Sequence, residues 1–240
     1  MTTGEKIGIL SRHVTPERLA KMRRALENRT YMLSVILEDI YQPHNAAAAM
    51  RSCDAFGVQR AFIIENRYPM RISHHVDMGT SKWMQIEKFR SRTCSSPEGA
   101  KNREPNESDA ENTLRAIARA KSLGYTVAAA TLRGNPMDLS ALPADRPIAV
   151  MIGTELTGLS DAAHEGADIA FKMDMLGFAQ SLNLSVFAAL CISSLSSRMR
   201  SGGCQWKMTP EQREEVLLSW LFKSISSAPE ILADAEAGGS

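Results

Sequence analysis

The chain has 240 residues, of which 44% are hydrophobic, and its formal net charge at pH 7 is +1. It has enough apolar material for the core of one large domain or two small ones. With so small a net charge, the chain as a whole has no electrostatic attraction to nucleic acid. A site for a polyanion must therefore be a local basic patch.

Neither a membrane segment nor a disulfide framework is indicated. Apolar runs such as the seven-residue VFAALCI fall far short of a membrane span, which needs roughly 20 residues, and the N-terminus lacks the apolar stretch of a secretory signal. The cysteines lie far apart without a C-x-x-C pair, at Cys53, Cys94, Cys191 and Cys204. We therefore predict a cytoplasmic protein with free thiols, no membrane contact and no metal.

The first thirty residues are predicted to form a basic helical segment, with seven Lys or Arg against three Asp or Glu. Thr15 stands at an N-cap position before Pro16, which predicts a helix to about residue 28. Apolar residues recur on one side of it at Leu19, Met22 and Leu26. The other side, with Arg18, Lys21, Arg23 and Arg24, either faces phosphates or forms an ordinary solvated surface.

A β-α-β unit follows. The apolar run YMLSVILEDI (residues 31–40) predicts a buried strand, the alanine-rich stretch after it a helix that ends at Gly57, and VQRAFIIEN (residues 58–66) a second strand. One more short strand is predicted at residues 83–89. The polar stretch at residues 90–112 is almost empty of large apolar residues and predicts a mobile surface excursion.

Strands and helices then alternate, which predicts an α/β fold with a largely parallel sheet. We expect helices near residues 113–123 and 161–165, and strands at residues 125–132, 147–153 and 169–175. A long helix is expected to start after Ser181 or Asn183, both possible N-caps, and to end at Gly202.

The chain is predicted to close with one capped helix. Thr209 and Gln212 form a capping-box pattern at its start. An apolar stripe follows at Val216, Leu217, Trp220 and Leu221 and must dock on its own domain or on a second subunit. The last dozen residues are expected to fray.

Three stretches carry the residue types of a binding site. In the first, PHNAAAAMRSCDAFG (residues 43–57), Asn45 is expected to cap the helix and Arg51 follows about 9 Å further along its axis. Arg51 is able to lean back toward the helix mouth, and the small alanines are expected to leave that approach uncrowded. Free N–H groups and the helix dipole favour an anion there. The stretch is either a phosphate site or an ordinary helix with a surface arginine.

The other two stretches are loops. The second, IGTELTGLS (residues 152–160), follows an apolar strand, where open parallel sheets bind ligands. Its glycine spacing fits neither a dinucleotide nor a P-loop fingerprint. The third, MDMLGFAQSLNLS (residues 173–185), either encloses an apolar or aromatic ligand beside backbone donors or is a routine helix start.

In this order and at these distances, the three stretches resemble the three motifs of the SpoU/TrmH-type RNA ribose 2′-O-methyltransferases of the SPOUT superfamily. The resemblance runs from about residue 33 to about residue 206, interrupted by a surface insertion at residues 90–112. It implies a methyltransferase domain at residues 31–203, with an α/β SPOUT-type sheet and a deep C-terminal trefoil knot. Short helical extensions are expected at residues 1–30, which would bind RNA, and at residues 204–240.

The resemblance also implies an activity and partners. S-adenosylmethionine would be the cofactor. The protein would be a homodimer with RNA lying across both subunits, and the second subunit would be the partner of the apolar terminal helix. The PHN spelling and short terminal helices most resemble the enzymes that methylate a guanosine ribose in the tRNA D loop. Two alternatives stay open: another RNA ribose, such as a ribosomal one, or RNA binding without catalysis.

Roles carry over residue by residue. The catalytic asparagine and arginine match Asn45 and Arg51. Polar residues that shape the active site match Glu155, Ser181 and Asn183. Positions around the adenine and ribose of the cofactor match Ala130, Leu132, Gly153, Met173, Met175 and Leu182. Contacts with tRNA phosphates are expected from Arg12, Arg18, Lys21, Arg23, Arg24, Arg198, Arg200 and Lys207.

The implied chemistry leaves two questions open. The resemblance implies that Arg51 contacts the RNA phosphate and acts as the base. Because a guanidinium stays protonated in proteins, the second interpretation has charged Arg51 stabilise the developing alkoxide. Asn45 would orient Arg51 or the ribose. Asp174 stands where relatives usually carry proline, so its carboxylate either accepts from the adenine amino group or loosens the loop.

Overall fold

The computed structural model describes residues 1–70, 79–94, 104–154 and 157–237. The chain divides into two compact units. The larger is Tyr31–Trp206, and the smaller combines Met1–Thr30 with Lys207–Ser240. The two helical extensions that the sequence predicts as separate pieces therefore belong to one unit.

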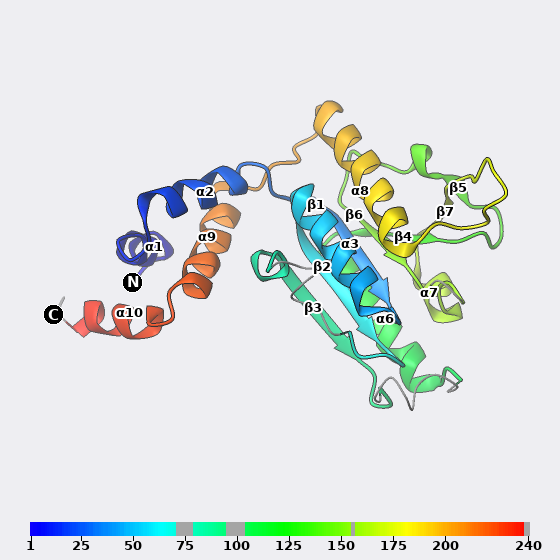
Figure 1. Cartoon of the computed structure of the whole chain (residues 1–240), viewed down its shortest axis with the longest axis horizontal. Helices are drawn as coiled ribbons and strands as arrows, with labels where there is room; N and C mark the ends of the chain where they lie inside the picture. Colours follow the sequence, from blue (N-terminus) through cyan, green and yellow to red (C-terminus); the bar gives the residue numbers. More distant parts are fainter. Residues whose placement is uncertain (71–78, 95–103, 155–156, 238–240) are drawn as a thin grey trace. The chain divides into compact units, whose positions relative to one another are not determined.

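The larger unit is built on a seven-stranded sheet with the order β3-β2-β1-β6-β4-β7-β5 (Figure 1). Its strands are β1 (Thr30–Glu38), β2 (Val58–Glu65), β3 (Gln85–Arg90), β4 (Thr126–Ala130), β5 (Met137–Asp138), β6 (Ile148–Ile152) and β7 (Ile169–Lys172). The pairs β1–β6, β2–β3, β4–β6, β4–β7 and β5–β7 are parallel. The predicted α/β class with a largely parallel sheet is confirmed, and among the strands of the described residues only the two-residue β5 has no predicted counterpart.

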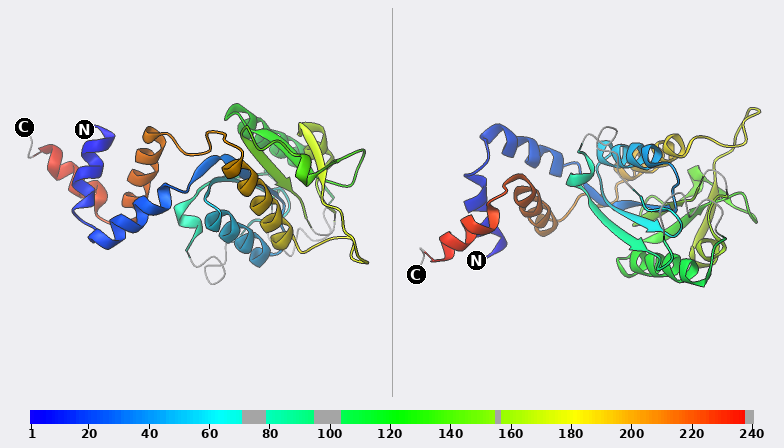
Figure 2. Two further views of the ribbon diagram at one scale, coloured as in Figure 1. Left: turned by 90° about the horizontal axis from the view of Figure 1, so that it is seen from above. Right: turned by 60° about the horizontal axis from the view of Figure 1, so that its bottom comes forward.

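Helices cover both faces of this sheet (Figures 1 and 2). On one face α3 (Pro43–Ala55) packs beside α8 (Leu184–Ser201), and on the other α6 (Glu107–Ser122) packs beside α7 (Asp161–Gly166). Short 3₁₀ turns occupy Ser81–Trp83 and Leu139–Ala141. Side chains alternate along a strand, so Val35 and Leu37 of β1 join the first core and Ile36 joins the second.

The alanine run of the first motif is part of the core. Ala46, Ala47 and Ala49 are fully buried, and Ala46 and Ala49 belong to the cluster that α3 and α8 form with the sheet. Small side chains allow two helices to approach closely. These alanines therefore fill the packing surface of α3, a role that was not expected of them from the sequence.

The polar stretch at residues 90–112 is only partly a surface excursion. Asn106 is the N-cap of α6 and shares a capping box with Asp109, so the helix begins at Glu107 and not near residue 113. Asp109 and Asn112 are each 3% exposed. Asn112 donates from Nδ2 to the Phe89 carbonyl at 3.0 Å. Composition predicts a loop here because these side chains are polar. In the structure they are buried, and their hydrogen bonds make that burial possible. Residues 95–103 lie outside the described part of the chain.

The smaller unit packs α1 (Thr3–Ser11) and α2 (Pro16–Leu26) against α9 (Pro210–Ser224), with α10 (Ala228–Ala237) beside α1. The predicted caps at Thr15 and Thr209 are confirmed. The α9 stripe is buried at Val216, Leu217, Trp220 and Leu221. It thus docks on helices of its own chain and does not call for a second subunit. The helix α1 was not expected from the sequence, and α10 occupies most of the end that was expected to fray.

Two further expectations concern the membrane and the thiols. Among the described residues no single helix is long and apolar enough to cross a membrane; α9 and α10, bent by 109° where they meet, pass that test of length and composition only as a pair. All four cysteines are free, as predicted. Burial raises the pKa of the Cys191 thiol to about 12, so this thiol stays protonated and unreactive.

Replacing Trp220 by alanine is expected to destabilise the smaller unit. The Trp220 side chain is 2% exposed, and the Arg29 guanidinium lies 5.4 Å from its ring centroid. Truncation leaves a cavity and should lower the free energy of unfolding by about 3–5 kcal/mol. Urea unfolding followed by far-UV circular dichroism measures the loss.

Phe222→Ala is the matched control, because Phe222 lies on the same helix and is 39% exposed. Its truncation should cost less than about 1 kcal/mol. Equal losses in the two variants would contradict the packing described for α9.

Candidate active site and cofactor pocket

A pocket of about 350 Å³ opens where three parallel strands end. Ligands bind at the carboxyl edge of such sheets, and here Ala130 ends β4, Ile152 ends β6 and Lys172 ends β7. The loops that leave these strands form the walls. The pocket is lined by all six positions expected around the cofactor, Ala130, Leu132, Gly153, Met173, Met175 and Leu182.

The second motif is a tightly folded loop. A Cβ placed on Gly153 would lie 2.3 Å from the carbonyl carbon of Gly158 and 2.5 Å from the Leu159 nitrogen. Thr154 and Gly158 exchange two backbone hydrogen bonds of 3.1 and 3.0 Å, and Gly158 has a φ of +68°. Both glycines are therefore needed for the turn. The loop folds back on itself and becomes a thin wall of the pocket.

The pocket is also lined by residues that were not expected from the sequence, among them Thr131, Arg133, Thr154, His164, Lys172 and Phe187. His164 has the most informative contacts. Its Nδ1 lies 2.7 Å from the Ser160 carbonyl, and its Nε2 lies 2.9 Å from Thr131 Oγ1. Because a carbonyl only accepts, Nδ1 carries a proton. His164 thus ties the end of the second motif to the loop after β4. His164 could have been identified from the sequence, because it stands one helical turn after the end of the second motif.

Two asparagines join the first and third motifs. Asn183 is the N-cap of α8, and its Oδ1 accepts from the Ser185 N–H at 2.9 Å. Its Nδ2 donates to Asn45 Oδ1 at 3.1 Å. Of the expected catalytic residues, the structure thereby brings Asn45 and Asn183 into direct contact.

The predicted capping role of Asn45 is wrong. Gln42 is the N-cap of α3 and makes no side-chain capping bond. Asn45 lies inside the first turn, is 2% exposed and donates to Gln42 Oε1 at 3.2 Å. Pro43 explains the shift, since its fixed φ suits the first helical position and starts the helix before Asn45.

The remaining expected active-site residues, Ser181, Arg51 and Glu155, are not part of this contact between the two asparagines. Ser181 is exposed and lines the cofactor pocket. Arg51 is exposed on α3, and within the described part of the chain it makes no hydrogen bond or ion pair. Six residues along a helix turn a side chain to a different side, so Arg51 does not share the buried face of Asn45. Glu155 lies outside the described residues.

Asp174 has a local partner. Its carboxylate lies 2.6 Å from Lys172 Nζ, and this hydrogen bond raises the pKa of Lys172. Lys172 lines the pocket, whereas Asp174 is not among the described lining residues. The structure therefore shows the Asp174 carboxylate engaged by its neighbour on the same strand end.

The basic residues expected to bind tRNA fall into two groups. Those of the smaller unit are exposed: Arg12, Arg18, Lys21, Arg23, Arg24 and Lys207. Those of α8 make contacts within the fold. Arg198 donates to the carbonyls of Leu139, Ser140 and Leu142 at 2.7–3.1 Å. Arg200 donates to the Phe56 carbonyl at 3.2 Å, and its guanidinium lies 4.1 Å from the Trp206 ring centroid.

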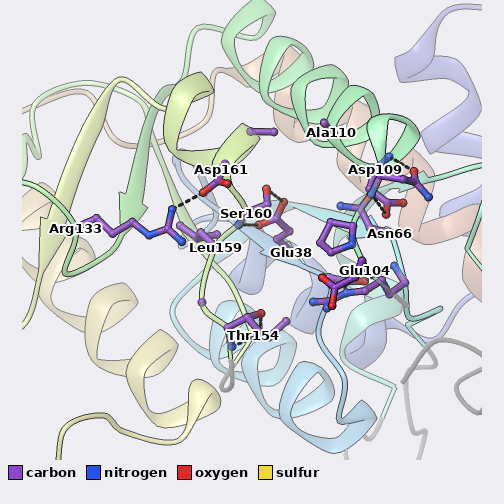
Figure 3. A pocket seen from close by; sticks show the side chains of 17 residues that line it. Glu38, Asn66, Glu104, Asp109, Ala110, Arg133, Thr154, Leu159, Ser160 and Asp161 are labelled. Carbon is purple, nitrogen blue, oxygen red and sulfur yellow. Dashed lines mark hydrogen bonds and ion pairs between the residues drawn. The ribbon is translucent and has the colours of Figure 1, made fainter. Parts of the chain in front are cut away.

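A second cavity, of about 680 Å³, shares the wall formed by the second motif (Figure 3). Four of its charged side chains form two ion pairs. Arg67 Nε lies 2.6 Å from Asp39 Oδ2, and Arg133 forms an ion pair with Asp161. Glu38 and Ser160 also line this cavity and meet at its centre in Figure 3. The second motif is thus a partition between two cavities.

Known proteins match this chain in sequence and in fold. It is 31% identical over 216 residues to a tRNA (guanosine(18)-2′-O)-methyltransferase of Borreliella burgdorferi, covering 90% of this chain and 89% of that protein. The crystal structure of the Aquifex aeolicus TrmH/SpoU tRNA modifying enzyme aligns with a TM-score of 0.69 at 24% identity, over 87% of this chain and 97% of that one. An AdoMet-bound rRNA methyltransferase from Sinorhizobium meliloti aligns with a TM-score of 0.54 at 18% identity, over 73% and 60%.

The family match covers the sheet and all three motifs. The model of the SpoU rRNA Methylase family matches residues 32–96 and 98–193, which include the strands that end at the pocket and both asparagines. The structural likenesses support the same fold. The chain therefore belongs to the SpoU rRNA Methylase family.

Proposed function

We propose that this protein transfers a methyl group from S-adenosylmethionine to the ribose 2′-oxygen of guanosine 18 in the D loop of tRNA. The observation that carries the proposal is a single pocket that gathers every expected cofactor position. It is supported by the hydrogen bond between Asn45 and Asn183, which joins the first and third motifs. The name of the Borreliella relative, which matches nearly the whole chain, favours tRNA over ribosomal RNA.

The pocket fits S-adenosylmethionine by its chemistry. Met173, Met175 and Leu182 offer apolar surface for an adenine, and the loop backbone would supply the polar contacts because these side chains cannot. Leu132 lines the pocket and is 75% exposed, so a ligand there would cover apolar surface that otherwise faces water. The cofactor would supply an electrophilic methyl group on a sulfonium.

The side chains of the first and third motifs have different roles in this proposal. Asn45 is buried and held by Asn183, which suits a group that orients its neighbours. Arg51 is exposed and makes no side-chain bond within the described part of the chain, which suits a contact with the RNA phosphate and the reacting hydroxyl. A guanidinium rarely gives up its proton, so we favour stabilisation of the developing alkoxide over a role as the base.

The proposal includes the family's homodimer and trefoil knot. Support for the dimer comes from apolar side chains that the third motif and α8 leave exposed, Leu176, Phe178, Val186 and Leu190. We take the surface that carries these side chains as the proposed dimer surface, because the stripe of α9 is already covered. RNA would lie across both subunits. Family membership supports the knot, and a tRNA substrate supports a cytoplasmic location.

The double variant Val186→Glu with Leu190→Glu is expected to be monomeric at concentrations where the wild type is dimeric. Two charges on this surface would be desolvated in the interface. Sedimentation equilibrium measures the mass. Leu114→Glu, on α6 with 42% exposure, is the matched control and should leave the mass unchanged. A wild type that is monomeric throughout would contradict the proposed dimer.

Arg51→Ala is expected to reduce methyl transfer to an unmodified tRNA transcript by about 10²–10³-fold, the typical effect of removing one charge-stabilising donor. The assay follows labelled methyl from S-adenosylmethionine and maps the methylated nucleotide. Binding of S-adenosylmethionine should persist, because Arg51 is not among the described residues of the pocket.

Arg146→Ala is the control for that experiment. Arg146 is exposed and precedes β6, at the opposite edge of the sheet from the pocket, so transfer should continue. Label on an rRNA but not on tRNA would overturn the tRNA assignment. S-adenosylmethionine binding without transfer to either RNA would overturn catalysis and favour an RNA-binding protein.

The triple variant Lys21→Ala, Arg23→Ala and Arg24→Ala is expected to bind tRNA with a weaker dependence on salt. Each lost phosphate contact lowers the slope of log affinity against log salt by about 0.7–0.9, so the slope should fall by about 2–3. Fluorescence anisotropy over a salt series measures it. Substitutions are preferable to deleting α2, because a deletion would also remove the packing of α2 against α9.

Arg119→Ala with Lys121→Ala is the comparison for the salt series. Both side chains lie on α6 and pair with Glu87 and Asp168, so the slope should stay at the wild-type value. An unchanged slope in the triple variant would remove α2 from the proposed RNA-binding surface.

A further inference from the structure

Glu38 is a buried carboxylate to which the proposed chemistry gives no role. It ends β1, shortly before the first motif, and is 2% exposed. Three donors converge on it. The Ser160 N–H donates to Oε2 at 2.9 Å, and the hydroxyls of Ser160 and Thr113 each donate to Oε1 at 2.7 Å. Burial raises the pKa of Glu38, and these hydrogen bonds act against that rise by favouring the charged form.

Ser160 is the last residue of the second motif, and its polar atoms are all engaged. Its Oγ accepts from the Ala163 N–H at 3.1 Å as the N-cap of α7. Its carbonyl lies 2.7 Å from Nδ1 of His164. Its N–H and hydroxyl both point to Glu38 (Figure 3). The end of the second motif is therefore fixed between β1 and α7.

Glu38 is itself anchored by a buried hydrogen-bond chain. Thr113 Oγ1 accepts from Asn66 Nδ2 at 3.0 Å, and Asn66 Oδ1 accepts from Asn112 Nδ2 at 2.9 Å. Asn112 also donates to the Phe89 carbonyl at 3.0 Å. The chain thus runs from the second motif through β1 and α6 to the ends of β2 and β3. Buried and fully paired networks of this kind hold their members in one arrangement.

We propose that Glu38 is a positioning residue for cofactor binding. It holds Ser160, and through Ser160 it sets the wall that the second motif gives to the pocket. The link is short, because Gly158 and Leu159 line the pocket and directly precede Ser160. This inference rests on the proposed function, since it assigns the pocket to S-adenosylmethionine.

The arrangement requires a carboxylate and not merely a side chain of that size. The Ser160 N–H, which can only donate, faces Oε2, and the hydroxyls of Thr113 and Ser160 both donate to Oε1. Three donors therefore face two acceptor oxygens. Glutamine would replace one oxygen with an NH₂ group and set donor against donor, which leaves buried donors unpaired.

The test measures S-adenosylmethionine affinity by isothermal titration calorimetry for Glu38→Gln, Ser160→Ala and the double variant, well below their unfolding temperatures. Glu38→Gln is expected to raise Kd about tenfold. Because the two side chains act through one contact, the double variant should bind about as weakly as the weaker single variant. In the transfer assay KM for S-adenosylmethionine should rise, while kcat at saturating cofactor stays near the wild-type value.

Glu65→Gln is the matched control for a purely structural effect. Glu65 ends the neighbouring strand β2, is 5% exposed, and accepts from the Met70 N–H and Lys88 Nζ at 2.9 and 3.2 Å. This variant should lose thermal stability and keep the wild-type Kd.

The outcomes separate this inference from the proposed function. A folded Glu38→Gln variant with the wild-type Kd overturns the inference, as does an equal rise in Kd for Glu65→Gln. If Glu38→Gln does not fold, Ser160→Ala decides, and an unchanged Kd there overturns the inference. A wild-type protein that binds no S-adenosylmethionine overturns the proposed function itself.

Discussion

The close approach of Gly153 to the backbone of Gly158 is the constraint on which the site depends. It folds the loop after β6 back on itself, so that one short segment separates the cofactor pocket from the second cavity. The same turn delivers Ser160 to Glu38 at the end of β1. Because β1, β6, β4 and β7 are adjacent and parallel, one glycine pair shapes both a wall of the cofactor pocket and the contact of the second motif with the end of β1.

Most of the larger unit could be predicted from the sequence because its signals are local. Apolar runs bounded by glycines give the strands, and Asn183 acts as the cap that its position indicates, as Thr209 does in the smaller unit. The cofactor positions carried by the family resemblance all reach one pocket. The start of α6 could not be predicted from composition, since Asp109 and Asn112 look like loop residues and are buried only through partners distant in sequence.

The errors at the site have similar physical causes. The capping role expected of Asn45 belongs to Gln42, because the proline between them starts the helix, and the buried position of Asn45 depends on Asn183, far along the chain. Arg198 looks like a phosphate ligand at the end of a helix, yet its guanidinium donates to three carbonyls in and directly after the 3₁₀ turn at Leu139–Ala141. A sequence pattern gives the charge of such a side chain but not the carbonyl groups that surround it.

The smaller unit is assembled from two segments that lie on either side of the larger unit in the sequence, and this has a consequence for biosynthesis. Its helices α1 and α2 leave the ribosome first, but the α9 surface that covers them is made only after the whole larger unit. Domains generally fold as units during synthesis, so the sheet has time to form while the early helices are still without their partner. Until α9 emerges, Leu10, Met22 and Leu26, which are buried in the finished protein, remain open to chaperones. The smaller unit can therefore be completed only after the larger unit has been synthesised.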